Sequence, residues 1–221
     1  MQNLWLENNQ LSGPIPVGLG NLTNIQGFQL RGNQLSGPIP TELADLINLS
    51  AIGLGNNQLS GPIPVELGNL IALHELDLGQ NNLDGPIPPE LTNLTRLHLL
   101  SPYGNNLEGT IPPELGNLGN LTKLILSQNE LSRPIPQELG NLTILKRLAL
   151  NENNLNGPLP AELSDLRNLP YLKLSENPEL TCRETFAALV WASVLPSYEG
   201  PEEVCGVEIT DSWLPCIHTS E

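Results

Sequence analysis

One spacing governs this chain: asparagine recurs every 24 residues, without an insertion or deletion, over eight copies. We number the positions of the repeat 1 to 24 from Met1, so that this asparagine is position 9. It stands at Asn9, Asn33, Asn57, Asn81, Asn105, Asn129, Asn153 and Asn177. A leucine follows it two places later in seven copies, and the blocks continue with a Gly, an Ile-Pro or Leu-Pro pair and further leucines. A period of this length indicates a solenoid, because one short coil cannot bury its own apolar side chains and neighbouring coils must stack.

The apolar positions predict a half-buried strand in each repeat. In LHELDL, residues 73–78, Leu76 and Leu78 alternate with Glu75 and Asp77, which places the leucines inside and the acids outside. Stacked copies would pair in parallel about 4.8 Å apart. We therefore expect one parallel sheet built from residues near 26–30, 50–54, 74–78, 122–126, 146–150 and 170–174.

The remaining repeated residues predict a scaffold role. The amide of the position-9 asparagine both donates and accepts, so it can satisfy buried backbone groups and form a ladder between coils. The Gly at position 13 permits a positive φ, as at Gly61. The two prolines of the GPIP segment fix an extended path, which we expect not to continue a central sheet.

Composition excludes several classes of protein. Twenty Gly and 21 Pro rule out a helix bundle, and an apolar content of 39% argues against disorder. The net charge of −15 argues against nucleic acid or an anionic membrane as the main partner. The longest apolar run near the end has 11 residues, too few for membrane insertion, and we expect no secretory signal within the sequence.

The unit LSAIGLGNNQLSGPIPVELGNL, residues 49–70, resembles the plant-specific class of leucine-rich repeats. Similar repeats occur in receptor-like kinase ectodomains, receptor-like proteins, polygalacturonase-inhibiting proteins and bacterial surface proteins. The resemblance implies an α/β solenoid, a right-handed curved superhelix with a concave parallel sheet, over residues 1–177 as seven full units and the strand of an eighth. It also implies recognition of a protein, peptide or glycan, outside the cell or at its surface, without catalysis or a cofactor.

Three departures from the repeat carry expectations. Pro102 replaces the position-6 leucine, so its strand should be disturbed in mid-sheet. Arg133 replaces the turn glycine, which leaves the backbone angles of that turn open. The paired-cysteine amino-terminal cap usual in the family is missing, so the coil containing Leu4 and Leu6 is expected to associate weakly or to fray.

Residues 178–221 are predicted to form a disulfide-stapled, helical carboxy-terminal cap. Thr181 and Glu184 form a capping box ahead of a helix that would end near residue 195. Three cysteines resemble the staple of an exported cap, and of the three possible pairs we favour Cys182 with Cys205, which leaves Cys216 free or paired elsewhere.

A search for chemistry finds no nucleophile motif, phosphate loop or zinc signature, so we expect neither an enzyme nor a metal site. His74 and His98 should lie about 5 Å apart, either as solvated side chains or, with Glu75, as metal ligands. The glutamates of position 18 would form a column that is either a solvated face or a calcium site. They are Glu42, Glu66, Glu90, Glu114, Glu138 and Glu162.

The outward positions of the strands change along the chain, and this change predicts the binding surface. They are small or polar in the first repeats, whereas from the fifth repeat onward they become large, aromatic or basic. The candidate ligand-binding residues are Leu99, Tyr103, Lys123, Ile125, Arg147, Tyr171 and Lys173. The cations would supply charge and the tyrosines stacking for an acidic or carboxylate-bearing ligand, unless the cations only keep an acidic protein soluble. The alternative function is a structural or adhesive surface protein that uses regular columns on cations, a glycan surface or ice.

Overall fold

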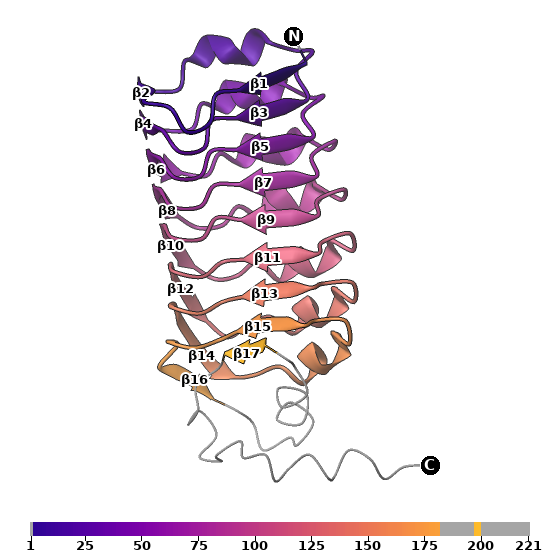
Figure 1. Ribbon diagram of the computed structural model, residues 1–221. Coiled ribbons are helices and arrows are strands. Elements are labelled where there is room, and N and C mark those ends of the chain that lie inside the picture. The colour runs from indigo at the N-terminus through magenta and orange to yellow at the C-terminus, as the bar shows by residue number, and fades with distance from the viewer. Residues whose placement is uncertain (1, 182–196, 200–221) are drawn as a thin grey trace.

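The structure, a computed structural model, describes residues 2–181 and 197–199. The chain winds as a right-handed solenoid whose coils stack along one axis, with the first coil at one end and residue 181 near the other (Figure 1). Each of the first seven coils contributes a strand to the concave sheet, a strand to a second sheet and a short helix.

The concave sheet has nine parallel strands in the order β1-β3-β5-β7-β9-β11-β13-β15-β17. From β1 to β15 every pairing joins residues 24 places apart, as Leu76 pairs with Leu100, so the predicted register is confirmed. The strands are β1 (Asn3–Trp5), β3 (Gly27–Gln29), β5 (Ala51–Gly53), β7 (Glu75–Asp77), β9 (Leu99–Ser101), β11 (Lys123–Ile125), β13 (Arg147–Ala149), β15 (Tyr171–Lys173) and β17 (Ser197–Glu199).

A second sheet of eight parallel strands runs in the order β16-β14-β12-β10-β8-β6-β4-β2. The repeat pattern did not predict this second sheet. Six of its strands end at or just before the first proline of the Gly-Pro segment, and Pro62 and Pro158 occupy the terminal place in the ladder, so the prolines do not continue the sheet. The strands are β2 (Ser12–Gly13), β4 (Gln34–Gly37), β6 (Gln58–Pro62), β8 (Asn82–Gly85), β10 (Asn106–Gly109), β12 (Glu130–Arg133), β14 (Asn154–Pro158) and β16 (Glu179–Thr181).

The helices of the described residues are 3-10 helices of five residues, each preceded by a proline in an extended conformation. Five residues make less than two turns, a length for which 3-10 geometry is common. The helices are η1 (Val17–Asn21), η2 (Thr41–Asp45), η3 (Val65–Asn69), η4 (Pro89–Asn93), η5 (Pro113–Asn117), η6 (Gln137–Asn141) and η7 (Ala161–Asp165).

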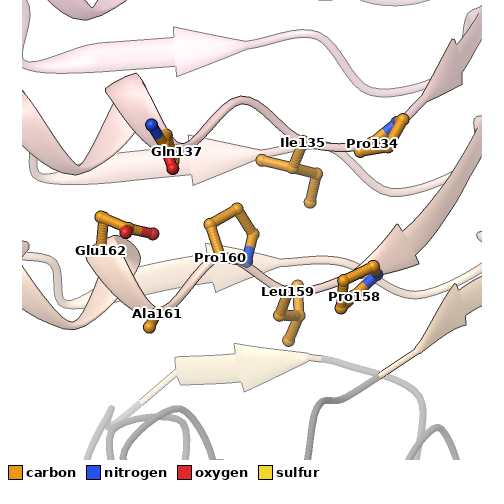
Figure 2. A pocket seen from close by; sticks show the side chains of 8 residues that line it. All are labelled: Pro134, Ile135, Gln137, Pro158, Leu159, Pro160, Ala161 and Glu162. Carbon is orange, nitrogen blue, oxygen red and sulfur yellow. The ribbon is translucent and has the colours of Figure 1, made fainter.

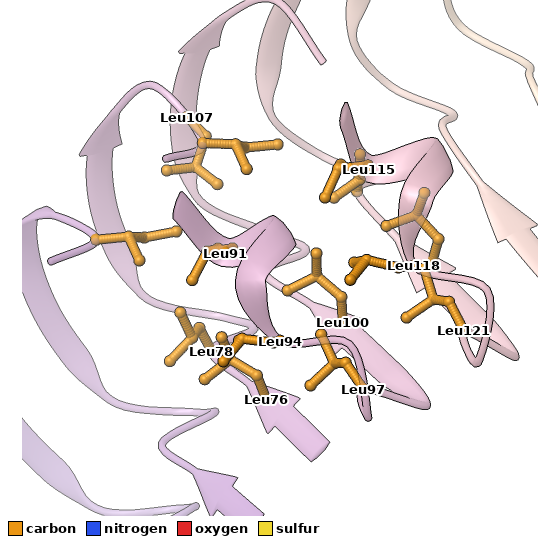
Figure 3. Close-up of a cluster of buried hydrophobic side chains, with 14 of the residues drawn as sticks. Leu76, Leu78, Leu91, Leu94, Leu97, Leu100, Leu107, Leu115, Leu118 and Leu121 are labelled. Atoms are coloured by element: carbon orange, nitrogen blue, oxygen red, sulfur yellow. The ribbon is translucent and has the colours of Figure 1, made fainter. Parts of the chain in front are cut away.

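Leucine and isoleucine columns fill the space between the two sheets and the helices (Figure 3). Leu76 and Leu124 are 0% exposed, as the repeat predicts. The first coil differs, since Leu6 and Leu11 are each 38% exposed and Trp5 is 67% exposed. Weak self-association through this coil stays a prediction.

The position-9 asparagines form the expected ladder between coils. The side chain of Asn105 accepts a hydrogen bond from the Leu83 amide at 2.9 Å and donates to the carbonyls of Leu78 and Pro102 at 3.1 and 3.0 Å. Each asparagine from Asn33 to Asn177 makes the same set of bonds to its own coil and to the preceding one. Asn9 bonds only to carbonyls of its own coil, those of Leu6 and Glu7.

Both irregular repeats keep the fold. Pro102 is buried and β9 still pairs with both neighbours, but its pairing with β11 is one residue shorter because proline has no amide to donate. The disturbance is therefore limited to the end of the strand. Arg133 adopts a φ of 75°, the left-handed conformation that Gly109 and Gly157 adopt at the same position.

The carboxy-terminal segment extends both sheets. Ser197–Glu199 forms strand β17 beside β15, because the edge of β15 offers unpaired backbone groups to the next extended segment. Strand β16 likewise pairs with β14. The predicted helix and the Cys182–Cys205 pair lie outside the described residues, as does Cys216.

Candidate functional site

The concave face is formed by repeat positions 3, 5 and 7, whose side chains alternate with the buried leucines of positions 4 and 6. Because the strands pair in register, side chains at the same position form rows across the sheet, one residue per coil. The surface chemistry of the face can therefore be followed row by row from β1 to β15.

The first half of the face is covered by side chains that lie over glycines. A Cβ atom at Gly53 would overlap the side chain of Gln29, and one at Gly79 would overlap the ring of Tyr103. The Tyr103 ring therefore leans toward the preceding coil. These glycines leave room for neighbouring side chains to lie across the sheet.

The pKa of Asp77 on this face is clearly shifted. Burial raises the pKa of Asp77 above its usual value of 3.8, and nearby Glu75 adds to the shift. A hydrogen bond from the Gly79 amide at 3.1 Å and the Arg31 guanidinium at 3.5 Å oppose it without cancelling it. The Arg31 side chain is half exposed, so solvent weakens its attraction.

The second half of the face brings four of the predicted ligand-binding residues into one row. Leu99, Lys123, Arg147 and Tyr171 are in-register neighbours on β9, β11, β13 and β15. Lys123 and Arg147 are exposed, and Leu99 and Tyr171 are half-buried at the two ends of the row. Two cations thus lie side by side between an aliphatic and an aromatic side chain.

A second row runs beside the first through Ile125, Ala149 and Lys173. The Arg147 guanidinium carbon lies 4.1 Å from the centre of the Tyr171 ring, and the Lys173 ammonium lies 6.0 Å from it. Tyr171 is thus flanked by two cations, an arrangement that holds Arg147 in place.

Tyr103 does not join this cluster. It lies in the position-7 row, two coils before Asn151 in that row, with its ring over Gly79. Tyr103 and Tyr171 belong to coils three repeats apart, about 14 Å at the spacing of parallel strands. The two tyrosines therefore cannot stack on the same small group.

The structure adds a cluster that the sequence did not indicate, at the far end of β13. Asn151 donates from Nδ2 to Glu152 Oε1 at 2.8 Å, and Gln128 donates from Nε2 to Glu152 Oε2 at 2.8 Å. Asn151 is 8% exposed, and its Oδ1 has no hydrogen-bond partner among the described residues. Nothing in the repeat distinguishes Asn151 from the serines that occupy this position in adjacent coils, Ser127 and Ser175, so only its burial reveals it.

The two histidines that the sequence offered as possible metal ligands lie close together. The rings of His74 and His98 are 5.2 Å apart, as expected, with His74 half-buried and His98 exposed. Within the residues that the structure describes, no three His, Cys, Asp or Glu side chains gather as they would around a metal ion.

The position-18 glutamates are exposed except Glu138, which is half-buried. Each is the second residue of a 3-10 helix, where unpaired amide groups favour a carboxylate, and this accounts for the column without a bound cation.

The side opposite the concave sheet has a shallow crevice between the sixth and seventh coils (Figure 2). It is lined mainly by the turn segments that contain Ile135 and Leu159, and Glu162 is its only charged residue. Its volume of about 360 Å³ lies between Gly-Pro turns and 3-10 helices, away from the basic row. None of the helices within residues 2–181 is long and apolar enough to cross a bilayer.

The fold and this face define a class, the solenoids of short repeats that expose a parallel sheet. A family model described as a leucine-rich repeat region matches residues 29–198, and a leucine-rich repeat model matches residues 1–22. The chain belongs to the leucine-rich repeat family. A search of curated proteins gave no match.

Several solved structures are similar. The ectodomain of the Arabidopsis thaliana receptor kinase GASSHO1/SCHENGEN3, in complex with CASPARIAN STRIP INTEGRITY FACTOR 2, is 43% identical with a TM-score of 0.80 over 81% of this chain and 22% of that one. The Arabidopsis receptor kinase HAESA, in complex with the peptide hormone IDA and the co-receptor SERK1, is 35% identical with a TM-score of 0.75 over 81% and 30%. The Leptospira interrogans protein LIC12759 is 32% identical with a TM-score of 0.71 over 90% and 49%. The chain thus spans less than half of each of these proteins.

Proposed function

We propose that this chain is a non-catalytic recognition module, extracellular or at a cell surface, whose carboxy-terminal concave face binds an acidic or carboxylate-bearing ligand. The observation that carries the proposal is the row Leu99, Lys123, Arg147 and Tyr171, with its two exposed cations side by side. Such a pair attracts a carboxylate, and the flanking apolar groups would bury the rest of a ligand.

The charge of the protein supports this assignment. A chain with a net charge of −15 carries nine basic residues, and three of them lie in the two rows of this face. Among the described residues, neither Lys123 nor Arg147 forms a salt bridge. Both cations are therefore available to an incoming carboxylate, and the surrounding acids would repel anions from other surfaces.

The similar structures support a peptide or protein as the ligand. Two of them are plant receptor kinases whose structures were determined in complex with a peptide hormone or with CASPARIAN STRIP INTEGRITY FACTOR 2. A peptide with a free carboxyl end fits the paired cations, and an acidic polysaccharide offers the same carboxylate chemistry. The varied rows of the concave face favour such a ligand over a repetitive lattice.

The test uses two double variants with equal charge change. Lys123→Glu with Arg147→Glu reverses the paired cations of the concave face, whereas Arg96→Glu with Arg167→Glu reverses two exposed cations at the edge of the solenoid. The probes are a hexapeptide library with free carboxyl ends, the same library with amidated ends, and an oligouronate. Binding is measured by affinity selection and calorimetry.

We expect the natural sequence to select free carboxyl ends or the oligouronate, and the first double variant to lower affinity about 100-fold at an unchanged melting temperature. The control pair should bind normally. Equal selection of free and amidated peptides without oligouronate binding, or normal affinity in the folded first variant, would contradict the proposal.

A further inference from the structure

The side-chain oxygen of Asn151 is a buried acceptor that the fold leaves unused. Asn151 is 8% exposed, and its Oδ1 has no hydrogen-bond partner among the described residues. It stands in the position-7 row of the concave face, between coils that carry Ser127 and Ser175 at the same position. Buried polar atoms without partners are rare, and such an atom on a ligand-binding face indicates a missing group.

The neighbouring contacts fix which atom is left free. Asn151 Nδ2 donates to Glu152 Oε1 at 2.8 Å, and Gln128 holds the other oxygen of Glu152 at 2.8 Å. Rotating the Asn151 amide by half a turn would place Oδ1 against the Glu152 carboxylate, where two acceptors would repel each other. The amide orientation is thereby set, and Oδ1 stays the open acceptor.

The charge around the acceptor selects the class of donor. Glu152 is half-buried beside Asn151, and Glu176 is exposed at the same position of the next coil. An anion would be repelled here, and a neutral amide would satisfy the acceptor without balancing the charge. An ammonium or guanidinium group does both, since it donates several hydrogen bonds and carries a positive charge.

We propose that Asn151 and Glu152 form a subsite for a cationic hydrogen-bond donor of the ligand, an ammonium or a guanidinium group. Arg147 lies four residues earlier in the same coil, about 13 Å away for an extended backbone. A ligand with a carboxylate on Lys123 and Arg147 and a cation on Asn151 would lie along the strand, spanning four to five extended residues. The inference rests on the proposed function in assigning the carboxylate end.

The test uses four alanine-based pentapeptides. The first has a free amine and a free carboxyl end, the second is acetylated at the amine, the third is acetylated and has arginine as its first residue, and the fourth has a free amine and an amidated carboxyl end. Affinities are measured by NMR titration, with the side-chain amide signal of Asn151 as the reporter. We expect at least one of the two cationic peptides with free carboxyl ends to shift this signal and to bind at least tenfold more tightly than the second peptide. The one that does so identifies the source of the cation.

Asn151→Ser places in this coil the residue that adjacent coils carry, so the variant should fold. It should abolish the tenfold advantage of the cationic peptide and leave the affinity of the acetylated peptide unchanged. Asn168→Ser, a matched change at an exposed edge residue, should retain the advantage.

Two results would overturn the inference: equal affinities of the cationic and acetylated peptides, or an advantage that persists in Asn151→Ser. An Asn151 signal that no peptide shifts would also overturn it, because water would then fill the site. The proposed function has its own test in the same series. It is contradicted if the fourth peptide, with its amidated carboxyl end, binds as tightly as the first, with its free carboxyl end.

Discussion

The asparagine ladder can be tested by removing one rung from the middle of the solenoid. Asn105→Ala deletes the acceptor of the Leu83 amide, which lies in the interior at 2.9 Å from Asn105 Oδ1. A buried amide without a partner costs about 1–3 kcal/mol. The lost bonds to the Leu78 and Pro102 carbonyls cost less, because each carbonyl keeps a second asparagine donor. We expect a loss of about 2–4 kcal/mol in the free energy of unfolding.

The matched control is Asn9→Ala, which removes the same side chain from the same repeat position. Asn9 is exposed and bonds only to carbonyls of its own coil, so the change should cost about 0.5 kcal/mol or less. Urea denaturation followed by far-UV circular dichroism measures both values. If Asn105→Ala is no more destabilising than Asn9→Ala, the asparagines do not hold the coils together.

Three further changes test other parts of the scaffold. Arg133→Gly relieves a φ of 75° in an L-residue and should raise the free energy of unfolding by about 1 kcal/mol in the same assay. A lower free energy of unfolding would mean that contacts of the Arg133 side chain outweigh the strain of its backbone angle. Gly116→Ala places a Cβ against the Glu138 carbonyl and should cost about 1–3 kcal/mol, whereas Gly119→Ala faces open space and should be neutral; equal effects would exclude close coil packing. Burial raises the pKa of Asp77, so its ionisation costs stability as the pH rises from 3.8 through the higher folded value. Asp77→Asn should be more stable than the natural protein at pH 7 and equal to it below about pH 3. A variant that is more stable only at pH 3 would mean that folding lowers the pKa of Asp77 and does not raise it.

The period and the apolar pattern were enough to predict the concave sheet, its register and the asparagine ladder. These features depend on residues that recur in every coil, so that one repeat predicts the next. The second sheet was not predicted, because its strands are only two to five residues long and lack the apolar alternation of the concave strands; the prolines end them, as at Pro62. Strand β17 was missed because it lies after the period ends and is recruited by the edge of β15.

The site was only partly predictable, because it depends on residues that do not recur in every coil. The sequence placed Lys123, Arg147 and Tyr171 on the concave face, and the structure shows that they form one row because they share a repeat position. It could not show that the Tyr103 ring would lean over a glycine, nor that Asn151 would be buried with an unused oxygen. Side-chain directions depend on neighbours in adjacent coils and not on the repeat.

The central claim, that the carboxy-terminal half of the concave face binds a carboxylate-bearing ligand, is tested most directly by photo-crosslinking. A hexapeptide selected for its free carboxyl end carries a diazirine on its penultimate side chain, and crosslinked sites are mapped by mass spectrometry. The account predicts crosslinks at Leu99, Ile125 or Tyr171 that the free-carboxyl peptide competes away and the amidated peptide does not. Crosslinks confined to the 3-10 helices, for example at Val65 or Pro89, would contradict it.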